Sequence, residues 1–282
     1  MRFLMCTDGS PLAENALRFA APLARAARAE VTLLGVAASP QDEAQVRTSF
    51  TRAQPLFLSE AEEKIRIGSR AADEILAEDQ SGVYDLLVFG SRGRRGLDRL
   101  IYGSVASRLA RYARTPVLIV KGQRPGVRRV LACTGGEAPG ERVARWSGQV
   151  AHWLGAEVTV LHVMSQLPLS SGAALDELRE TAEQAIAGGT REGVHLAREM
   201  ELLREQGVTT AMRPKLRHGL VLEEIAAEAS KGDYDLVVIG AHQAPDLPGG
   251  WAGFKEYLLD DVADQIISAV NRPVLVVRSS RQ

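Results

Sequence analysis

The segment Phe3-Leu-Met-Cys-Thr-Asp-Gly9 returns as Val130-Leu-Ala-Cys-Thr-Gly-Gly136, an offset of 127 residues from Phe3 to Val130. The same offset places Ala29-Glu-Val-Thr-Leu-Leu-Gly-Val36 on Ala156-Glu-Val-Thr-Val-Leu-His-Val163. Two further pairs follow in the same order at larger offsets, Tyr84–Gly90 with Tyr234–Gly240 and Thr115–Val120 with Arg272–Val277. Four matched segments in one order indicate that the chain is a tandem duplication.

The growing offset predicts two insertions in the second copy. One, of 23 residues, falls after its second strand, in the charged stretch Leu175–Gln206. The other, of 7 residues, falls in the loop-like sequence Ala244–Gly250. The turn-forming residues Lys121–Gly126 join the two copies. We therefore expect one domain at residues 1–122 and a second at 127–280.

Within each copy, short runs rich in Val, Ile and Leu alternate with longer segments of helical periodicity. Runs with little polar alternation suit strands that are covered on both faces. Ser10 is placed to cap the first helix, predicted over Pro11–Arg28, with Pro11 in its first turn. The apolar helix stripes are Leu12, Ala16, Phe19, Ala20 and Leu23; Ala72, Ile75 and Leu76; and Val105, Leu109 and Tyr112. This alternation predicts an α/β fold of two doubly wound parallel sheets, with ligand sites at the carboxyl ends of the strands.

Composition narrows the function classes. Hydrophobic residues make up 45% and charged residues 24% of the 282 residues, as in ordinary soluble proteins. The net charge of -1 provides no basic field for nucleic acid, and no apolar run approaches the ~20 residues that span a bilayer. Cys6 and Cys133 are too few for a disulfide framework, and Asp8 interrupts any signal peptide. We expect a cytoplasmic protein in which both cysteines are buried.

The most informative loop follows the fourth strand of the first copy. It reads Gly90-Ser-Arg-Gly93, then nine residues, then Gly103-Ser104 before a helix that begins at Val105. Glycines let the backbone approach a phosphate closely, and the free N–H groups of a helix start favour an anion. Beside the loop lie three cations, Arg92, Arg94 and Arg95. The alternative is that these glycines serve only tight turns and helix packing.

The spacing Gly-x2-Gly-x9-Gly-Ser resembles the nucleotide-binding motif of the universal stress protein family. The resemblance covers nearly the whole chain, because Thr7–Ser10, Leu33–Val36 and Thr115–Val120 also match segments of that family. It implies two tandem five-stranded sheets that are Rossmann-like, of the adenine nucleotide alpha hydrolase type. It also implies that the last strands, Val117–Val120 and Val274–Val277, pair within the chain as an intrachain pseudo-dimer. Any further homodimer would then use another surface.

The resemblance also implies a ligand, ATP, accompanied by a divalent cation such as Mg²⁺ or Mn²⁺. Asp8 would lie beside the adenosine, and the backbone of Val36 would contact the adenine edge. The remaining implied site residues shape the ribose and phosphate wall or present N–H groups to the phosphates: Gly90, Gly93, Gly103, Ser104 and Val105. No residue has an implied catalytic role.

The second copy departs from this motif. Gln243 aligns with Gly93, Asp260-Asp261 aligns with Gly103-Ser104, and Gly135 aligns with Asp8. Carboxylates at the helix start repel phosphate, although they also suit the positive end of a helix as ordinary caps. We expect that the second copy does not bind ATP in this way.

Histidines raise a metal alternative in the second copy. His162, His218 and His242 fall near predicted strand ends, close to Cys133. Imidazole and thiolate suit zinc, but their spacing matches no compact metal motif. We interpret them as pocket lining and expect no dedicated metal site.

These observations favour a nucleotide-responsive stress-response module whose protein partner the sequence does not identify. Two alternatives stay open: an enzyme that slowly hydrolyses ATP or phosphorylates itself, and a nucleotide-free scaffold or chaperone-like protein. The sequence has no Walker lysine and no arrangement of metal-binding carboxylates, which weighs against the enzyme.

Overall fold

The structure is a computed structural model that describes residues 1–91, 104–135, 138–164, 180–241 and 262–278. The described strands form one sheet in the order β3-β2-β1-β4-β5-β10-β9-β6-β7-β8. Their bounds are Arg2–Thr7 (β1), Glu30–Ala37 (β2), Glu62–Ile67 (β3), Leu86–Gly90 (β4), Val117–Val120 (β5), Arg129–Thr134 (β6), Glu157–Met164 (β7), Met212–His218 (β8), Leu236–Ala241 (β9) and Val274–Arg278 (β10).

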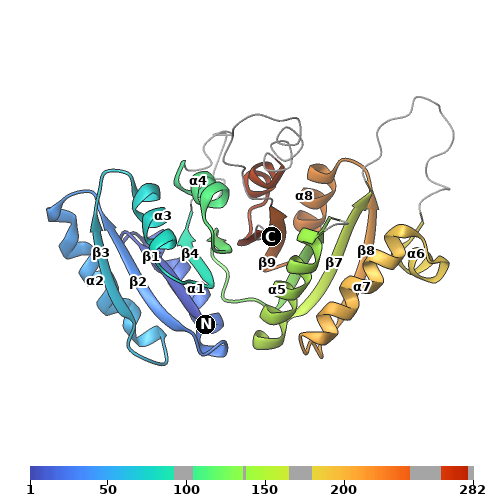
Figure 1. The fold of residues 1–282 in the computed structure, drawn as a ribbon, viewed down its shortest axis with the longest axis horizontal. Helices are drawn as coiled ribbons and strands as arrows, with labels where there is room; N and C mark the ends of the chain where they lie inside the picture. The colour runs from blue at the N-terminus through green and yellow to red at the C-terminus, as the bar shows by residue number, and fades with distance from the viewer. Residues whose placement is uncertain (92–103, 136–137, 165–179, 242–261, 279–282) are drawn as a thin grey trace.

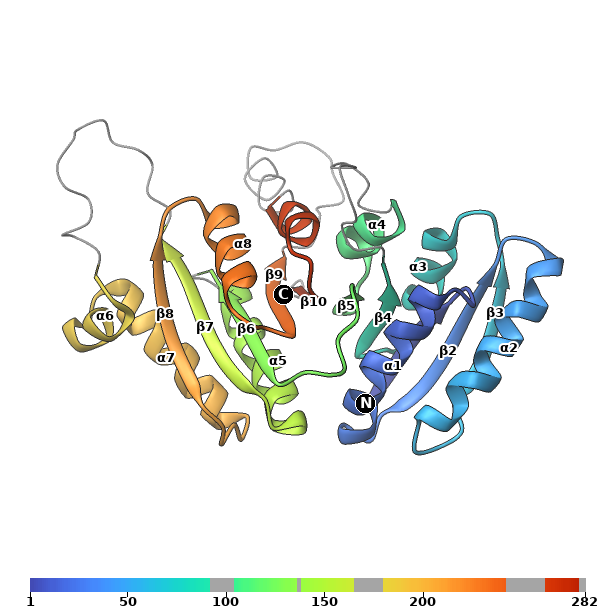
Figure 2. The ribbon, with the colours of Figure 1, turned by 180° about the vertical axis from the view of Figure 1, so that it is seen from behind.

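The sheet consists of two copies of one topology. β1 to β5 pair in parallel in the order β3-β2-β1-β4-β5, and β6 to β10 pair in parallel in the order β8-β7-β6-β9-β10. We call these two halves the first lobe and the second lobe. In Figure 1 they lie on opposite sides of the molecule, and Figure 2 shows β5 and β10 in the middle, where the two lobes meet. The predicted doubly wound α/β fold is confirmed.

The lobes are joined by an antiparallel pair of strands. β5 pairs with β10, with Leu118 opposite Leu275 and Val117 opposite Val276. These residues are almost completely buried, so the joint is part of the protein core. The predicted pairing of the last strands within one chain is therefore confirmed.

Helices cover both faces of the sheet, which explains the nearly continuous apolar strands. Residues of α1, α2, α5, α6 and α7 pack on one face, and residues of α3, α4, α8 and the helix at 262–269 pack on the other. The helix bounds are Pro11–Ala26 (α1), Glu43–Ala53 (α2), Ala71–Ser81 (α3), Ser104–Tyr112 (α4), Ala138–Leu154 (α5), Ala182–Gly188 (α6), Arg191–Glu205 (α7) and Val221–Lys231 (α8).

Local sequence signals account for the first helix. The Ser10 side chain accepts a hydrogen bond from the Ala13 N–H at 3.3 Å, and Pro11 occupies the first turn as predicted. The predicted apolar stripes are buried except for Val105, which is partly buried, and for Leu12 and Tyr112, which are 38% and 51% exposed. All three residues lie at a helix end, where periodicity does not show whether neighbouring elements still cover the helix.

The larger insertion lies where the offset places it. α6 and α7 lie between β7 and β8, whereas the first lobe has only α2 and two short 3-10 turns, Pro40–Asp42 and Gln54–Leu56, between β2 and β3. The shorter insertion, at Ala244–Gly250, lies outside the described residues.

A buried glutamate in each lobe, on the helix that precedes the fourth strand, ties that helix to the third strand of the lobe. In the first lobe, Glu78 accepts hydrogen bonds from Tyr84 Oη at 2.7 Å, Arg66 Nη2 at 2.7 Å and Lys64 Nζ at 3.0 Å. Burial alone would raise the pKa of Glu78, but these three donors outweigh it and lower the pKa to about 2.

The second lobe repeats this arrangement. Glu228 accepts from Tyr234 Oη at 2.8 Å, Lys215 Nζ at 2.7 Å and Arg217 Nη2 at 2.7 Å. Each donor occupies the place of its first-lobe counterpart, so the network is part of the duplicated unit. The sequence signal for it is a Lys-x-Arg strand followed by a Glu six residues before a Tyr.

Candidate functional site

The carboxyl edge of the first lobe contains the topological switch point of its sheet. β1 and β4 are neighbours, and the chain runs outward from them in opposite directions, to β2 and β3 on one side and to β5 on the other. In open α/β sheets, ligands bind at such a switch point, outside the carboxyl ends of the strands. Three of the predicted site residues, Asp8, Val36 and Gly90, lie at this edge.

Asp8 directly follows β1 and is exposed. Its Oδ1 accepts a hydrogen bond from the Ser10 N–H at 2.9 Å, and its carbonyl oxygen accepts one from Gln45 Nε2 at 3.3 Å. Gly9 has a φ of +75°, which turns the chain sharply into α1. The carboxylate is thus held at this edge by its own turn, and among the described residues its second oxygen accepts no hydrogen bond.

Val36 lies near the end of β2, partly buried. It pairs with Arg66 of β3, but it lies beyond the last β1–β2 pair, which joins Thr7 to Gly35. The side of the Val36 backbone that faces β1 therefore has no strand partner. A contact between this backbone and adenine stays a prediction.

Gly90 ends β4 and lies directly against α1. A Cβ atom at this position would come within 2.4 Å of the Leu12 carbonyl oxygen and 2.7 Å of its carbon. Only glycine permits this approach of the strand end to the first turn of α1. Gly90 therefore has a packing role, as expected if the loop glycines serve turns and helix packing. It also lies at the edge of the sheet where the predicted nucleotide site is located.

α4 begins at Ser104, and Val105 lies partly buried in its first turn. A helix start leaves backbone N–H groups without partners inside the helix, and these groups attract anions. Gly93 and Gly103 lie outside the described residues, as do the three loop arginines. The described part of the predicted site therefore consists of Asp8, Val36, Gly90 and the first turn of α4.

The same edge of the second lobe is built differently. Gly135 is exposed where the first lobe has Asp8, whereas Gln243, Asp260 and Asp261 lie outside the described residues. His162 Nδ1 hydrogen-bonds the Thr134 carbonyl oxygen at 3.1 Å. His195, from α7, hydrogen-bonds Thr134 Oγ1 through Nε2 at 3.2 Å.

The two imidazoles contact each other edge to face, with ring centroids 5.0 Å apart. Burial lowers the pKa of His162, and burial together with the nearby His162 lowers the pKa of His195 to about 4. Both rings are therefore neutral near pH 7. His195 was not identified from the sequence, although at the offset of 150 it aligns with Gln45 of α2, which also hydrogen-bonds the chain near the end of the first strand of its lobe.

Behind His195 lies a buried carboxyl group, that of Glu199. Its Oε1 is 3.7 Å from His195 Nδ1, too far for a hydrogen bond, and its Oε2 has no hydrogen-bond partner among the described residues. Gly140 of α5 makes room for it, since a Cβ there would lie 2.9 Å from Oε1. Burial, with a smaller contribution from the Glu141 carboxylate, raises the pKa of Glu199 to about 7.

We expect Glu199→Gln to stabilise the protein at pH 8. Because the folded state holds the Glu199 proton more tightly than the unfolded chain, wild-type stability falls as pH rises from about 4.5 through 7. Gln has no such loss, so at pH 8 the variant should gain about 3 kcal/mol in the free energy of unfolding. His195 titrates in the opposite direction, losing stability as pH falls, and it is present in both proteins.

Urea unfolding at pH 5 and pH 8 tests this prediction. The matched control is Glu201→Gln on the same helix, because the Glu201 side chain is 60% exposed. An equal stability of wild type and Glu199→Gln at pH 8 would show that Glu199 ionises without cost.

The alternative of a metal site formed by His162, His218, His242 and Cys133 is tested only in part, because His242 lies outside the described residues. His218 Nε2 contacts the Glu180 carbonyl oxygen at 3.3 Å. Cys6 and Cys133 are buried free thiols, and burial raises the pKa of both. Within the described ranges, no three His, Cys, Asp or Glu side chains are grouped to hold a metal ion.

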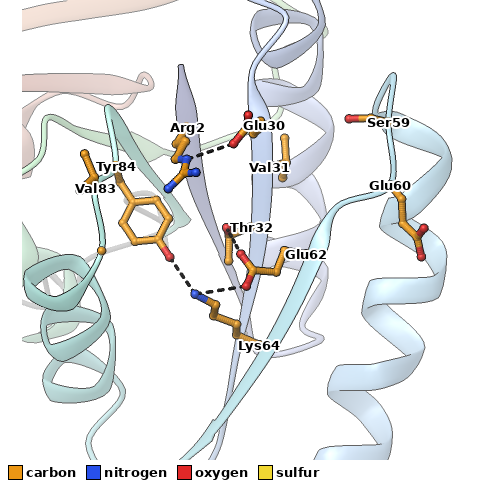
Figure 3. Close-up of a pocket in the computed structure, with 11 residues that line it drawn as sticks. Arg2, Glu30, Val31, Thr32, Ser59, Glu60, Glu62, Lys64, Val83 and Tyr84 are labelled. Carbon is orange, nitrogen blue, oxygen red and sulfur yellow. Dashed lines mark hydrogen bonds and ion pairs between the residues drawn. The ribbon is translucent and has the colours of Figure 1, made fainter.

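A polar cavity of about 460 Å³ lies at the opposite edge of the first lobe, where β1, β2 and β3 begin. Figure 3 shows Lys64 between Tyr84 and Glu62, at 3.4 Å from the hydroxyl and 3.4 Å from the carboxylate. Arg2 pairs with Glu30 at 3.0 Å. These charges mainly pair with one another, at the end of the strands remote from the switch point. The cavity is therefore separate from the predicted nucleotide site.

Known proteins resemble the chain over both lobes. The profile of the Universal stress protein family matches twice, over residues 1–121 and 126–278. A universal stress protein of Methanocaldococcus jannaschii is 30% identical over 138 residues, covering 43% of this chain and 81% of its own. A universal stress protein of Mycolicibacterium smegmatis is 28% identical over 207 residues, covering 71% of this chain and 64% of its own.

Solved structures agree on the fold. A universal stress protein from Archaeoglobus fulgidus superposes with a TM-score of 0.68 at 16% identity, covering 99% of this chain and 98% of its own.

Within the described residues, no helix has the length and apolarity that a membrane crossing needs. The repeat, the doubly wound lobes and the two profile matches lead to one conclusion: the chain belongs to the universal stress protein family, with two of its domains in tandem.

Proposed function

We propose that the first lobe binds ATP at its carboxyl edge and that the chain acts as a nucleotide-responsive module in the cellular stress response. The observation that carries this proposal is the convergence of Asp8, Gly90 and the first turn of α4 on the switch point of a family fold. The Gly-x2-Gly-x9-Gly-Ser spacing leads from Gly90 to the start of that helix. In this proposal Gly93, Gly103, Ser104 and Val105 surround the phosphates.

The second lobe, by this proposal, does not hold a nucleotide in the same way. Its edge has Gly135 in place of Asp8, and its sequence has two aspartates where the phosphate N–H donors would be. The functional units are residues 1–122, which bind ATP, and residues 127–280, which do not. Both cysteines are free, which agrees with a role in the reducing cytoplasm.

Mg²⁺ or Mn²⁺ would enter with the triphosphate. Such ions are usually held by phosphate oxygens and water, with one or two carboxylates. Asp8, an exposed carboxylate that directly follows β1 at this edge, suits this role. The nucleotide then acts by binding one conformation of the lobe more tightly than another.

The experiment is to identify what the purified protein carries. Nucleotide should be released by heat from dialysed protein and analysed by chromatography, and ATP affinity should be measured by calorimetry with and without Mg²⁺. Bound ATP without turnover supports a nucleotide-responsive module. Bound ADP together with measurable turnover would favour an enzyme that slowly hydrolyses ATP. A protein that carries no nucleotide and has no ATP affinity would contradict the proposal and favour a nucleotide-free scaffold.

A further inference from the structure

α4, whose first turn belongs to the proposed phosphate site, is attached to the second lobe through one carboxylate. Ser107 and Arg111, both on α4 of the first lobe, hydrogen-bond the same oxygen, Oδ2 of Asp264, at 3.2 Å and 2.5 Å. Asp264 belongs to the helix at residues 262–269 of the second lobe. Figures 1 and 2 show α4 and this red helix side by side in the middle of the molecule.

This contact is well placed to fix α4. Ser107 and Arg111 are four residues apart and so lie on one face of the helix. The side chains of Arg111 and Asp264 are only 31% and 16% exposed, so solvent screens their attraction less than it would at an open surface. α4 has nine residues, and Ser107 is two residues from Val105. A shift of α4 at this contact would therefore move the N–H groups of its first turn.

The helix that carries Asp264 is itself held by the first lobe. Lys121, which directly follows β5, is 4% exposed and donates hydrogen bonds to the carbonyl oxygens of Ile267 and Val270. A cation at the carboxyl end of a helix also stabilises the helix dipole. Asp264 is thus anchored on an element that the β5–β10 joint and Lys121 keep in place.

The two lobes are complementary here rather than identical. Asp264 occupies the second-lobe position that aligns with Ser107, at the offset of 157 that relates the last matched segments. Identical residues would place two carboxylates or two hydroxyls across the joint. Instead, a hydroxyl and a guanidinium from one lobe meet a carboxylate from the other.

We propose that Asp264 is a positioning residue for the phosphate site of the first lobe. It holds α4 in the orientation in which the N–H groups of Ser104 and Val105 meet a phosphate. The lobe without a nucleotide motif therefore sets the nucleotide affinity of its neighbour. This inference rests on the proposed ATP function.

The test compares two ligands that differ only in phosphate. Calorimetry should give the affinities of wild type and Asp264→Asn for ATP and for adenosine. We expect Asp264→Asn to weaken ATP binding about tenfold and to leave adenosine binding within twofold, because adenosine does not contact the start of α4. Asp264→Glu, which keeps the charge, should restore at least part of the ATP affinity.

The matched control removes another ion pair from the same helix. Arg108 of α4 pairs with Asp73 of α3 inside the first lobe at 2.5 Å, with side chains 44% and 29% exposed. Asp73→Asn should change ATP affinity less than twofold. An equal loss in both variants would show that α4 is sensitive to any surface charge and would overturn the role of the second lobe.

Other outcomes are equally decisive. If wild type and Asp264→Asn bind ATP equally well, this inference is overturned and the proposed function stays intact. Equal losses of ATP and adenosine in Asp264→Asn also overturn it, since they indicate a general loss of structure. Wild type without ATP affinity ends both proposals. If Asp264→Asn does not fold, Ser107→Ala removes one of the two contacts, and it should lower ATP affinity about threefold with adenosine unchanged; an unchanged ATP affinity there counts against the proposal.

Discussion

Gly103→Asp is expected to lower the ATP affinity of the chain at least a hundredfold without unfolding it. The second copy has Asp260 at the aligned position, so an aspartate at this point of the fold is compatible with a helix start. In the first copy the new carboxylate would stand beside the phosphates. At about 4 Å and an effective dielectric constant of about 20, the repulsion between two unit charges is on the order of 4 kcal/mol. A hundredfold loss corresponds to about 2.7 kcal/mol, well within that repulsion.

Calorimetric titration with ATP, together with circular dichroism of each variant, measures this effect. Gly126→Asp is the matched control, because it adds the same charge in the linker, where a Cβ meets nothing within 4 Å. Unchanged ATP affinity in Gly103→Asp would show that phosphate does not bind at the start of α4. The control should bind ATP like wild type.

Gly90→Ala is expected to destabilise the first lobe by about 3 kcal/mol. The added Cβ would lie 2.4 Å from the Leu12 carbonyl oxygen, a backbone atom of α1 that no side-chain rotation can move. Either β4 or the first turn of α1 must shift, and overpacking of this kind costs about 1–3 kcal/mol, with more where backbone must move. The shift would also disturb the turn that holds Asp8, so ATP affinity should fall as well.

Hydrogen exchange read by mass spectrometry locates this loss. Peptides from β1 and β4 should exchange faster in Gly90→Ala, whereas peptides from β6 and β7 should stay unchanged. Gly135→Ala is the control at the equivalent edge of the second lobe, where a Cβ meets nothing within 4 Å. Wild-type exchange in β4 of Gly90→Ala would mean that α1 adjusts to the methyl group at little cost.

The duplication is the reason why so much of the fold could be predicted from one sequence. Four segments appear twice in the same order, so a strand predicted in one copy can be compared with the equivalent segment of the other copy. The switch point follows from strand order, and it brings Asp8, Val36 and Gly90 to one edge. The pairing of Val117–Val120 with Val274–Val277 came from the family resemblance, and the β5–β10 register confirms it.

Tertiary contacts set the limit of that prediction. Helical periodicity placed Leu12 and Tyr112 on buried stripes, but no neighbouring element covers them fully. Glu78 and Glu228 look like solvent-exposed helix residues in the sequence, and only the fold brings Lys, Arg and Tyr donors around them. The contact of Asp264 with α4 spans 157 and 153 residues, and no local pattern reveals a contact of that range.

The β5–β10 joint also has a consequence for how the protein behaves at low abundance. Two separate subunits part from each other when they are diluted, and their mixed assemblies depend on how much of each is made. Here the two halves share one backbone, so their ratio is one to one in every molecule, from the first copy synthesised onward. The pairing of the two lobes is thus independent of how many other chains the cell contains.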